Sequence, residues 1–426
     1  MVLNSFDETN PPRRELLDDC VHCGFCLPTC PTYVLDGKET DSPRGRIQLM
    51  DLAERGEVPL DATFAQHFDN CLGCMACVTA CPSGVKYDRL LETTRPQIER
   101  NVPRAPADAL FRRLVFTLFP HPGRLRAATV LGLLYQRTGA QRLLRRFLPP
   151  RLRALDGLLP PVRLRALFSR TPAFVPARSE RRLRVALLSG CAQRVHFSHV
   201  NAATVRVLSA EGCDVVVPPR QPCCGALSMH AGLDTDAATR ARRTIDALGD
   251  LDVDAIVVNV AGCGSTLKEY GELLHDDPDY AQRAEAFAAK VRDVSELLAE
   301  LPPVAPRRPL PLRVAYHDAC HLANAQRITA QPRQLLTTIP GLTLLDVAEP
   351  DICCGSAGIY NLVQPEPAER LGRRKAENLL AGRPDVIATG NAGCLLQIRR
   401  HADDTTIPVV HPIELLDASL HGDEPA

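Results

Sequence analysis

Two stretches of the chain decide its fold and its chemistry: CVHCGFCLPTCP at residues 20–31 and CLGCMACVTACP at residues 71–82. Each stretch has the spacing Cys-x2-Cys-x2-Cys-x3-Cys-Pro. Three thiolates at this spacing can wrap one face of a cubane [4Fe-4S] cluster in a tight loop, whereas the fourth cysteine lies too far along to join them without strain. We therefore expect the fourth cysteine of each run to reach the cluster of the other run.

The two runs are those of a two-cluster bacterial ferredoxin, and they define two crossed ligand sets. A zinc ribbon is the alternative, but it uses two Cys-x2-Cys pairs per metal and predicts neither the third spaced cysteine nor the trailing Cys-Pro. Pro31 and Pro82 are expected to end the ligand loops. The predicted sets are Cys20, Cys23, Cys26 and Cys81 for one cluster, and Cys71, Cys74, Cys77 and Cys30 for the other.

The segment between the two runs carries apolar residues at helical spacing. These residues are Ile47, Met50, Leu52, Phe64 and Phe68. Residues 1–100 are therefore predicted to form a helical ferredoxin domain. Gly24 and Gly73 are expected to let backbone amides approach the cluster sulfurs.

Length and composition exclude several classes of protein. At 426 residues the chain is long enough for two to four domains, and its 50 basic and 50 acidic residues balance, which disfavours nucleic acid as a partner. The sequence has no apolar run long enough to predict a transmembrane helix. The first residues lack the pattern of an export signal, so we expect a reducing cytoplasmic environment in which the 17 cysteines serve metal binding or catalysis rather than disulfides.

Residues 101–184 contain no cysteine and are strongly basic, with 18 arginines against three acidic residues. Apolar stretches at residues 114–119 and 127–135 predict short amphipathic helices interrupted near Pro120 and Pro122. Such helices can lie on an anionic bilayer or on an acidic partner; alternatively, the segment is a solvated connector that covers acidic surface of the same chain. Proline-rich stretches at Pro160-Pro161, 171–182 and 301–312 mark the boundaries.

The remaining chain contains an internal repeat, residues 185–305 and 312–420. Four cysteines recur at offsets of 129 to 131 residues: Cys191, Cys223, Cys224 and Cys263 in the first half, and Cys320, Cys353, Cys354 and Cys394 in the second. Each half reads as strand, cysteine, helix, which predicts α/β halves with parallel sheets and sites at the carboxyl ends of the strands. The fold class is therefore α+β multidomain, with a helical ferredoxin domain followed by two α/β halves built around Cys-Cys-Gly (CCG) motifs.

Four cysteines per half match the thiolate count of one cubane cluster, so one or two further iron-sulfur clusters are predicted here. The adjacent pair in each half can contact different irons or bridge them. A buried structural set or a redox pair is the alternative. Cys213 has no counterpart and is expected to be a buried small hydrophobe. The histidines beside these cysteines are expected to be surface or hydrogen-bonding residues, with proton transfer or a partner site as the alternative: His196, His199, His317 and His321.

At these residues the sequence resembles a known family. CVHCGFCLPTCPTY, DSPRGRI, CLGCMACVTACPSGVKY, SGCAQ, the paired CCG motifs, KEYG and CCGSAGIY together resemble the iron-sulfur subunit of glycolate oxidase (glycolate dehydrogenase). The resemblance covers nearly the whole chain apart from the basic middle and the acidic Asp423 and Glu424. The CCG repeats are also similar to those of glycerol-3-phosphate dehydrogenase anchor subunits, lactate-utilisation proteins and heterodisulfide reductase subunits.

The resemblance implies a subunit that carries electrons rather than one that oxidises the substrate, so no catalytic residue is expected here. Flavoprotein subunits would oxidise glycolate, and a membrane quinone would be the final acceptor. The sequence shows no dinucleotide or P-loop fingerprint, so no flavin is expected in this chain. The resemblance also implies peripheral association with the cytoplasmic face of the inner membrane.

Three alternatives remain. An equivalent subunit could serve lactate or glycerol 3-phosphate oxidation, and the CCG halves could form a cluster-free scaffold. A heterodisulfide reductase-like catalytic subunit is the third, but in that family each repeat ends in Cys-x2-Cys, whereas Thr266 and Gln397 occupy the second positions here. This departure favours plain electron transfer.

Overall fold

The computed structural model describes residues 4–159, 167–402 and 406–422. Pro160 and Pro161, predicted as part of a boundary, and the acidic Asp423 and Glu424 lie outside the described residues. The regular elements of the N-terminal region are all helical, as predicted: α1 (Arg14–Asp18), α2 (Pro31–Asp36), η1 (Glu39–Asp41), α3 (Pro43–Glu54), α4 (Ala62–Asp69), α5 (Ala76–Ala80) and α6 (Tyr87–Asn101).

The helices of this region form where the sequence provides both a start signal and an apolar face. Helix α3 begins at Ser42, whose hydroxyl accepts a hydrogen bond from the Gly45 amide at 3.0 Å, and Pro43 follows at the first helical position. Four of the five expected apolar residues of α3 and α4 pack into one core, namely Ile47, Met50, Phe64 and Phe68, whereas Leu52 is only partly buried. The predicted helical ferredoxin region is confirmed.

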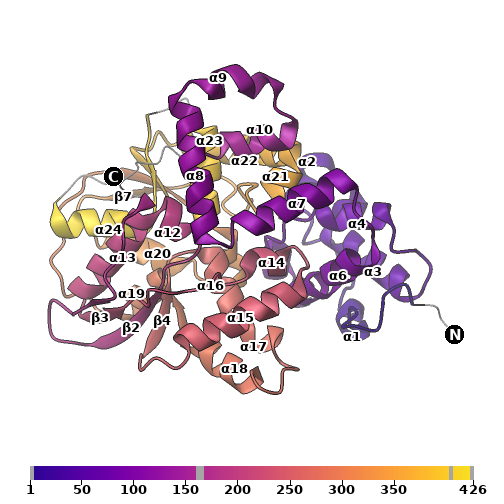
Figure 1. The fold of residues 1–426 in the computed structure, drawn as a ribbon, viewed down its shortest axis with the longest axis horizontal. Coiled ribbons are helices and arrows are strands. Elements are labelled where there is room, and N and C mark those ends of the chain that lie inside the picture. The colour runs from indigo at the N-terminus through magenta and orange to yellow at the C-terminus, as the bar shows by residue number, and fades with distance from the viewer. Residues whose placement is uncertain (1–3, 160–166, 403–405, 423–426) are drawn as a thin grey trace.

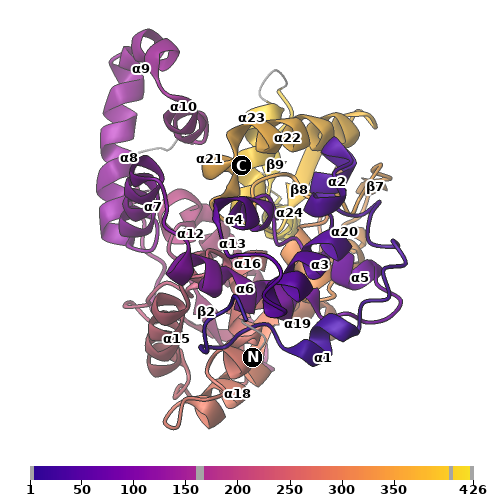
Figure 2. The ribbon, with the colours of Figure 1, turned by 90° about the vertical axis from the view of Figure 1, so that its right-hand side faces the viewer.

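The basic connector is also helical. Its elements are α7 (Pro106–Leu118), α8 (Pro122–Arg137), α9 (Ala140–Leu144), η2 (Arg145–Phe147) and α10 (Pro150–Gly157). Phe111 and Val115 of α7 pack on the second CCG half, and Leu125 and Leu133 of α8 pack on Val195 of the first half. Helix α9, with the adjoining ends of α8 and α10, projects away from the rest of the molecule (Figures 1 and 2).

The first CCG half is an α/β layer structure. Its elements are β1 (Phe174–Val175), β2 (Leu183–Leu188), α12 (Gln193–His196), α13 (Ser198–Ala210), β3 (Cys213–Val216), α14 (Ala226–His230), α15 (Asp234–Leu248), β4 (Ala255–Val258), α16 (Ala261–Lys268), α17 (Tyr270–Leu273), α18 (Ala281–Lys290), β5 (Val291–Asp293) and α19 (Val294–Glu300). The sheet order is β1-β3-β2-β4-β5. All pairs are parallel, as predicted, except that β1 runs antiparallel to β3 at the edge.

The second half repeats the pattern with an all-parallel sheet of order β7-β6-β8-β9. Its elements are β6 (Arg313–His317), η3 (His321–Ala325, one π-helical turn), α20 (Ala330–Thr337), β7 (Thr343–Leu345), α21 (Tyr360–Val363), α22 (Pro365–Leu380), β8 (Val386–Thr389), α23 (Ala392–His401), β9 (Val409–Val410) and α24 (Pro412–His421). The single helix predicted after the first cysteine of this half is divided between η3 and α20, because Arg327 adopts a left-handed conformation with φ +58°.

The two halves share one hydrophobic core. Val185 of β2 and Val314 of β6 are both fully buried in it, and so is Cys213, which confirms the expectation for that residue. The carboxyl ends of the strands carry the CCG cysteines, so the shared core fixes the two cysteine sets relative to each other.

Candidate metal centres

The first predicted ferredoxin set lines one cavity, which we name cavity A. Cys20, Cys23 and Cys26 of the first loop line it together with Cys81 of the second run. Burial raises the pKa of Cys20, and the nearby thiols of Cys81 and Cys23 raise it further. Cys23 is exposed, so cavity A lies at the protein surface.

The second predicted set lines a neighbouring cavity, cavity B. Cys71, Cys74 and Cys77 line it together with Cys30, the fourth cysteine of the first run. Cys30, Cys71 and Cys74 are buried, and Cys77 borders both cavities. Cavity B is therefore lined by four cysteines and cavity A by five, and the fourth cysteine of each run lines the cavity of the other run, as the spacing predicts. Four thiols around one cavity fit a [4Fe-4S] cluster.

Left-handed residues shape both cysteine loops. Two positions in each run have positive φ: His22 (+53°) and Gly24 (+87°) in the first, Gly73 (+62°) and Met75 (+59°) in the second. Gly24 and Gly73 therefore do not occupy equivalent positions, and a non-glycine residue takes the corresponding place in the other loop. The Gly73 amide donates a hydrogen bond to Cys71 Sγ at 3.4 Å, the approach to sulfur that was expected of it.

Arg46 supplies a buried positive charge beside cavity B. Its side chain is 1% exposed and donates to the His67 carbonyl at 2.6 Å, and it lies 3.6 Å from Asp41. Burial alone would raise the pKa of Cys71, but the guanidinium groups of Arg46 and Arg95 outweigh this effect and lower it. The charge of Arg46 thus favours the thiolate form of a cavity B cysteine.

The cysteines of the second CCG half come together at the carboxyl ends of β6 and β8. Cys320 Sγ lies 4.0 Å from Cys353 Sγ, and Cys354 Sγ lies 3.4 Å from Cys394 Sγ. All four are buried. Gly355 turns the chain after the cysteine pair with φ +85°, and an added Cβ would lie 2.7 Å from the Ala368 carbonyl.

The first CCG half gathers its four cysteines in the same way. Hydrogen bonds from the thiols of Cys191 and Cys224 hold the pKa of Cys223 well below its usual value. Burial and the neighbouring thiols of Cys223 and Cys263 raise the pKa of Cys224 well above its usual value. Gly225 has the same φ of +85° as its counterpart in the second half. The structure therefore brings together all four predicted residues in each half.

Thr266 and Gln397, which stand where a further cysteine would occur, have structural hydrogen bonds. The Thr266 hydroxyl donates to the Gly262 carbonyl at 3.2 Å. The Gln397 side chain donates to the Ala368 carbonyl at 3.0 Å and accepts from Asn361 at 3.1 Å. Both side chains are buried and help to fix the cysteine-bearing helices.

The four cysteine sets lie in a row. Cys77 borders cavities A and B, and Cys74 of cavity B packs in one apolar cluster with Cys320 and Cys353 of the second half. The Asn324 side chain, one turn after Cys320, donates to the Cys74 carbonyl at 3.1 Å.

The row continues to the first half. Asn391 binds Cys394 Sγ at 3.3 Å and also accepts from the Gly262 amide, next to Cys263, at 3.3 Å. The order of neighbours is therefore cavity A, cavity B, the second-half set and the first-half set.

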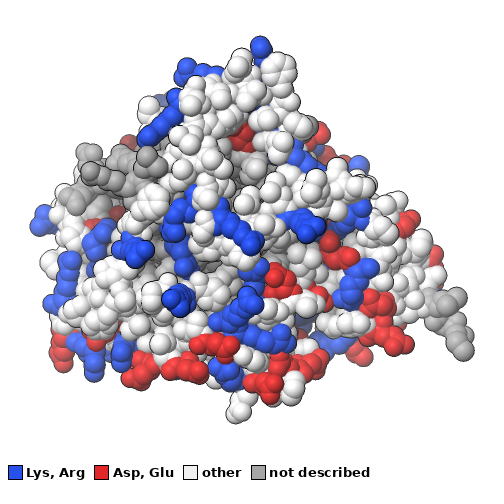
Figure 3. All heavy atoms as spheres, viewed as in Figure 1, with Lys and Arg blue, Asp and Glu red and all other residues white. Residues whose placement is uncertain are grey.

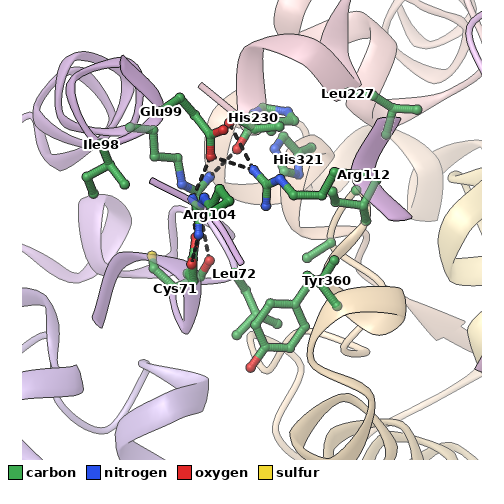
Figure 4. Close-up of a pocket in the computed structure, with 17 residues that line it drawn as sticks. Cys71, Leu72, Ile98, Glu99, Arg104, Arg112, Leu227, His230, His321 and Tyr360 are labelled. Atoms are coloured by element: carbon green, nitrogen blue, oxygen red, sulfur yellow. Dashed lines mark hydrogen bonds and ion pairs between the residues drawn. The ribbon is translucent and has the colours of Figure 1, made fainter. Parts of the chain in front are cut away.

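A pocket at the junction of the modules shows how the ferredoxin region is fixed on the CCG halves (Figure 4). Arg104 and Arg112 both bind Glu99, at 2.5 and 2.6 Å. The rings of His230 and His321, one from each half, lie 4.7 Å apart on the opposite wall. Arg95 donates to the Cys71 carbonyl at 2.6 Å and to the His230 carbonyl at 2.7 Å, and so links the Cys71 loop to the first half.

Comparisons with known proteins agree with this arrangement. A 4Fe-4S dicluster domain model matches residues 16–85, and a cysteine-rich CCG domain model matches residues 185–268 and 314–399. A model of the glycolate oxidase iron-sulfur subunit linker region matches residues 107–159. The chain is 41% identical to a probable glycolate oxidase iron-sulfur subunit of Bacillus subtilis, over 97% of this chain and 96% of that one. The chain belongs to the glycolate oxidase iron-sulfur subunit family.

Two further relatives show how widely the pattern occurs. The glycolate oxidase iron-sulfur subunit of Escherichia coli is 37% identical over 95% of this chain and 94% of its own length. Lactate utilization protein A of an Exiguobacterium species is 30% identical over 55% of this chain and 98% of its own length. The match to the linker model covers the basic connector, the part of the chain for which the resemblance was weakest.

The sequence did not indicate that two residues lie next to these sites, Arg46 and His317. Arg46 belongs to the DSPRGRI motif, which supported only the resemblance, and its place beside cavity B depends on the packing of α3 against α6. His317 is expected from the sequence to be a surface or hydrogen-bonding residue, and this is wrong: it is buried, and neither ring nitrogen has a hydrogen-bond partner among the described residues. The sequence did offer one indication, because the equivalent position in the first half is Leu188.

Proposed function

We propose that this chain is the electron-transfer subunit of a flavin-dependent glycolate dehydrogenase complex. Flavoprotein partners would oxidise glycolate to glyoxylate, and this chain would pass the electrons towards membrane quinone. The observation that carries the proposal is the row of four cysteine sets through one chain. Family membership supports the choice of glycolate, since the relatives of matching length are named for that substrate.

The proposed ligands are the sixteen cysteines of these sets. Cavity A would use Cys20, Cys23, Cys26 and Cys81; cavity B would use Cys71, Cys74, Cys77 and Cys30; the CCG halves would use Cys191, Cys223, Cys224 and Cys263, and Cys320, Cys353, Cys354 and Cys394. A bound [4Fe-4S] cluster accepts and releases one electron at a time, whereas a flavin yields two. The protein's contribution is to hold neighbouring sites close together and to bury most of the thiols of the inner three sites.

Exposure indicates which site exchanges electrons with a partner. Cavity A opens to the surface through the exposed Cys23, and Val21 and Phe25 beside it are 68% and 65% exposed. The sets of the CCG halves consist mainly of buried thiols. We therefore place exchange with an outside redox partner at cavity A.

Peripheral membrane association is supported by the projecting connector. Among the described residues, no helix combines the length and the apolar character needed to cross a bilayer. Five large apolar side chains are exposed at the end of the projection, and with the neighbouring arginines they form what we call the tip surface. Its apolar members are Leu131, Leu134, Leu143, Leu144 and Phe147, and its basic members are Arg137, Arg142, Arg145, Arg146 and Arg153.

Charge favours an anionic lipid surface as the partner of the tip surface. Residues 109–155 contain ten arginines and no acidic residue, and the nearby Asp156 is buried. Figure 3 shows arginines among uncharged side chains over this projection, whereas acidic residues gather along the opposite, lower edge of the molecule. Basic side chains around exposed leucine and phenylalanine are the pattern of an interfacial membrane contact.

The second candidate substrate is lactate, because a lactate utilization protein matches over nearly its whole length. Direct disulfide chemistry is less well supported, since Thr266 and Gln397 have structural hydrogen bonds and supply no fifth thiol.

Anaerobic reconstitution of the full chain tests the proposal. The wild-type chain should bind at least about eight irons, the content of two cubane clusters, and show paramagnetic centres on reduction. Cys81→Ser should perturb the cavity A signal and Cys30→Ser the cavity B signal, with Cys213→Ser as the control that changes neither. Bound zinc, or no paramagnetic centre on reduction, would contradict the proposal.

The substrate is tested with the partner subunits present. Glycolate should reduce the clusters of the assembled complex faster than lactate at equal concentration, as measured by stopped-flow absorbance. Faster reduction by lactate would assign the chain to the second candidate.

A further inference from the structure

His317 lies inside the second-half cysteine set rather than beside it. It is the last residue of β6, it is 2% exposed, and its ring lies in a group with Cys354 and Cys394 whose potential ligand atoms are all within 4.8 Å of one another. The three side chains come from β6, the CCG loop and α23, so the tertiary structure brings them together.

The hydrogen bonding of His317 is incomplete. Neither Nδ1 nor Nε2 has a hydrogen-bond partner among the described residues, although both are buried. A buried polar group without a partner costs about 1–3 kcal/mol of stability. Since no described protein atom provides that partner, we expect His317 to bind a group that is not part of the protein.

The internal repeat shows that the fold does not require histidine here. In the first half, β2 ends at Leu188, which lies opposite Val258 of β4. In the second half, the equivalent pair is His317 opposite Thr389, and the Thr389 hydroxyl also lacks a partner among the residues described. The same strand ends are apolar in one half and polar in the other. The polar pair is therefore specific to the second site.

We propose that His317 is a ligand to iron at the second-half site, which makes that site a mixed thiolate and imidazole centre while the first-half site is coordinated by thiolates alone. The inference rests on the proposed function, because it assumes that the second set of cysteines holds an iron-sulfur cluster. Imidazole is a common iron ligand. An iron held between His317, Cys354 and Cys394, whose ligand atoms lie within 4.8 Å of one another, would provide a partner for one of the two ring nitrogens.

A mixed ligand set would separate the two CCG sites in potential. His317 would add a neutral imidazole to the four thiolates of the second half, whereas the first half has four thiolates and Leu188 at the equivalent position. The two sites would then differ in their ligands, and the reduction potential of a cluster depends on its ligands. The two halves of the repeat would then hold two different metal sites on the same fold.

The test compares three reconstituted full-length chains: wild type, His317→Leu and His321→Leu. Leucine is the residue that the first half already carries at the equivalent buried position, so the substitution is expected to fold. His321 is the matched control, because its Nδ1 lies 3.5 Å from Cys320 Sγ but it is outside the three-residue group. Each chain is prepared twice, once with natural-abundance nitrogen and once with 15N in its histidines only. Both preparations are reduced stepwise and studied by pulsed EPR.

In the wild-type chain we expect a strong hyperfine coupling between the cluster spin and a nitrogen, and this coupling should change with the 15N histidine label. It should be absent in His317→Leu and persist in His321→Leu. The midpoint potential of one centre should also shift in His317→Leu and stay unchanged in His321→Leu. A coupling that persists in His317→Leu, or that disappears in His321→Leu alone, overturns the inference. Absence of every cluster signal in the wild type would instead contradict the proposed function.

A second measurement separates ligation from a structural role. Thermal unfolding of the metal-free chains should show His317→Leu to be at least as stable as wild type, because the change removes a buried unpartnered group. A loss of stability in the metal-free variant, together with unchanged EPR spectra and potentials, would show that His317 serves packing only.

Discussion

Arg46 combines two roles at a single position of the sequence. It is fully buried, it pairs with Asp41, and it donates to Thr32 at 3.2 Å beside Cys30. A buried cation of this kind is stable only with partners, and Asp41 together with the thiolates of cavity B supplies them. The charge near Cys71 also makes added negative charge at cavity B more favourable.

Replacement of Arg46 should therefore affect both stability and potential. Arg46→Gln is expected to destabilise the chain by about 3–5 kcal/mol, because a buried partner loses its counter-charge, and to lower the midpoint potential of the cavity B cluster. Arg44→Gln, in the same motif but on an exposed pair with Glu39, should cost about 0–1 kcal/mol. Denaturant titration and EPR redox titration measure the two effects; equal losses in both variants would contradict this account.

At the scale of elements, two glutamates face each other where α6 meets the turn between α16 and α17. Burial raises the pKa of Glu269 to about 7, with Arg89 opposing the shift and Asp88 adding to it. Burial and the neighbouring Glu269 raise the pKa of Glu92 well above its usual value. The ferredoxin region and the first CCG half thus meet through carboxyl groups that are more stable when protonated.

The pair predicts a loss of stability with rising pH. In the unfolded chain the glutamate has an ordinary pKa of 4.5, whereas in the folded chain the proton stays bound up to about pH 7. The stabilisation is therefore fully present below about pH 4.5 and is lost as the pH rises towards about 7. Glu92→Gln should remove this dependence and stabilise the chain at pH 8 by about 1–2 kcal/mol. Glu377→Gln, an exposed change on α22, is the control. Denaturant midpoints at pH 5, 6, 7 and 8 provide the measurement, and parallel curves for all three chains would rule out the coupling.

For the whole molecule, the tip surface lies at the far end of the projection formed by α8, α9 and α10, while the exposed cavity A belongs to the N-terminal region (Figure 2). A chain bound to lipid through the tip surface would leave cavity A accessible to a flavoprotein. The arrangement suits a subunit that joins a membrane to a redox partner.

Vesicle flotation tests this arrangement. The full chain should bind phosphatidylcholine vesicles that contain phosphatidylglycerol more strongly than pure phosphatidylcholine vesicles. At about 1 kcal/mol per arginine, the double change Arg142→Gln and Arg146→Gln should weaken binding roughly thirtyfold. Leu143→Ser with Phe147→Ser should weaken it too, and Val304→Ser, an exposed apolar change elsewhere, should not. Unchanged vesicle binding in the tip variants, with loss of the flavoprotein partner, would identify the tip surface as a protein interface instead.

The sequence by itself determined the features that depend on short-range spacing. Three cysteines at i, i+3 and i+6 can share one metal cluster in any fold, so the two runs and the crossing of Cys30 and Cys81 could be predicted before the structure was known. The repeat of strand, cysteine and helix likewise predicted two α/β halves, because local periodicity specifies elements and their order.

Only the tertiary structure decided the features that depend on packing between distant segments. The contact of Cys74 with Cys320, the place of Arg46 beside Cys71, and the burial of His317 without a partner all arise between residues that no local pattern connects. The edge strand β1 is a similar case, since two residues have too little periodicity to predict a strand and pair only because β3 offers a free edge. Spacing determines which ligands can share a site; the common core determines which sites are neighbours and what charge surrounds them.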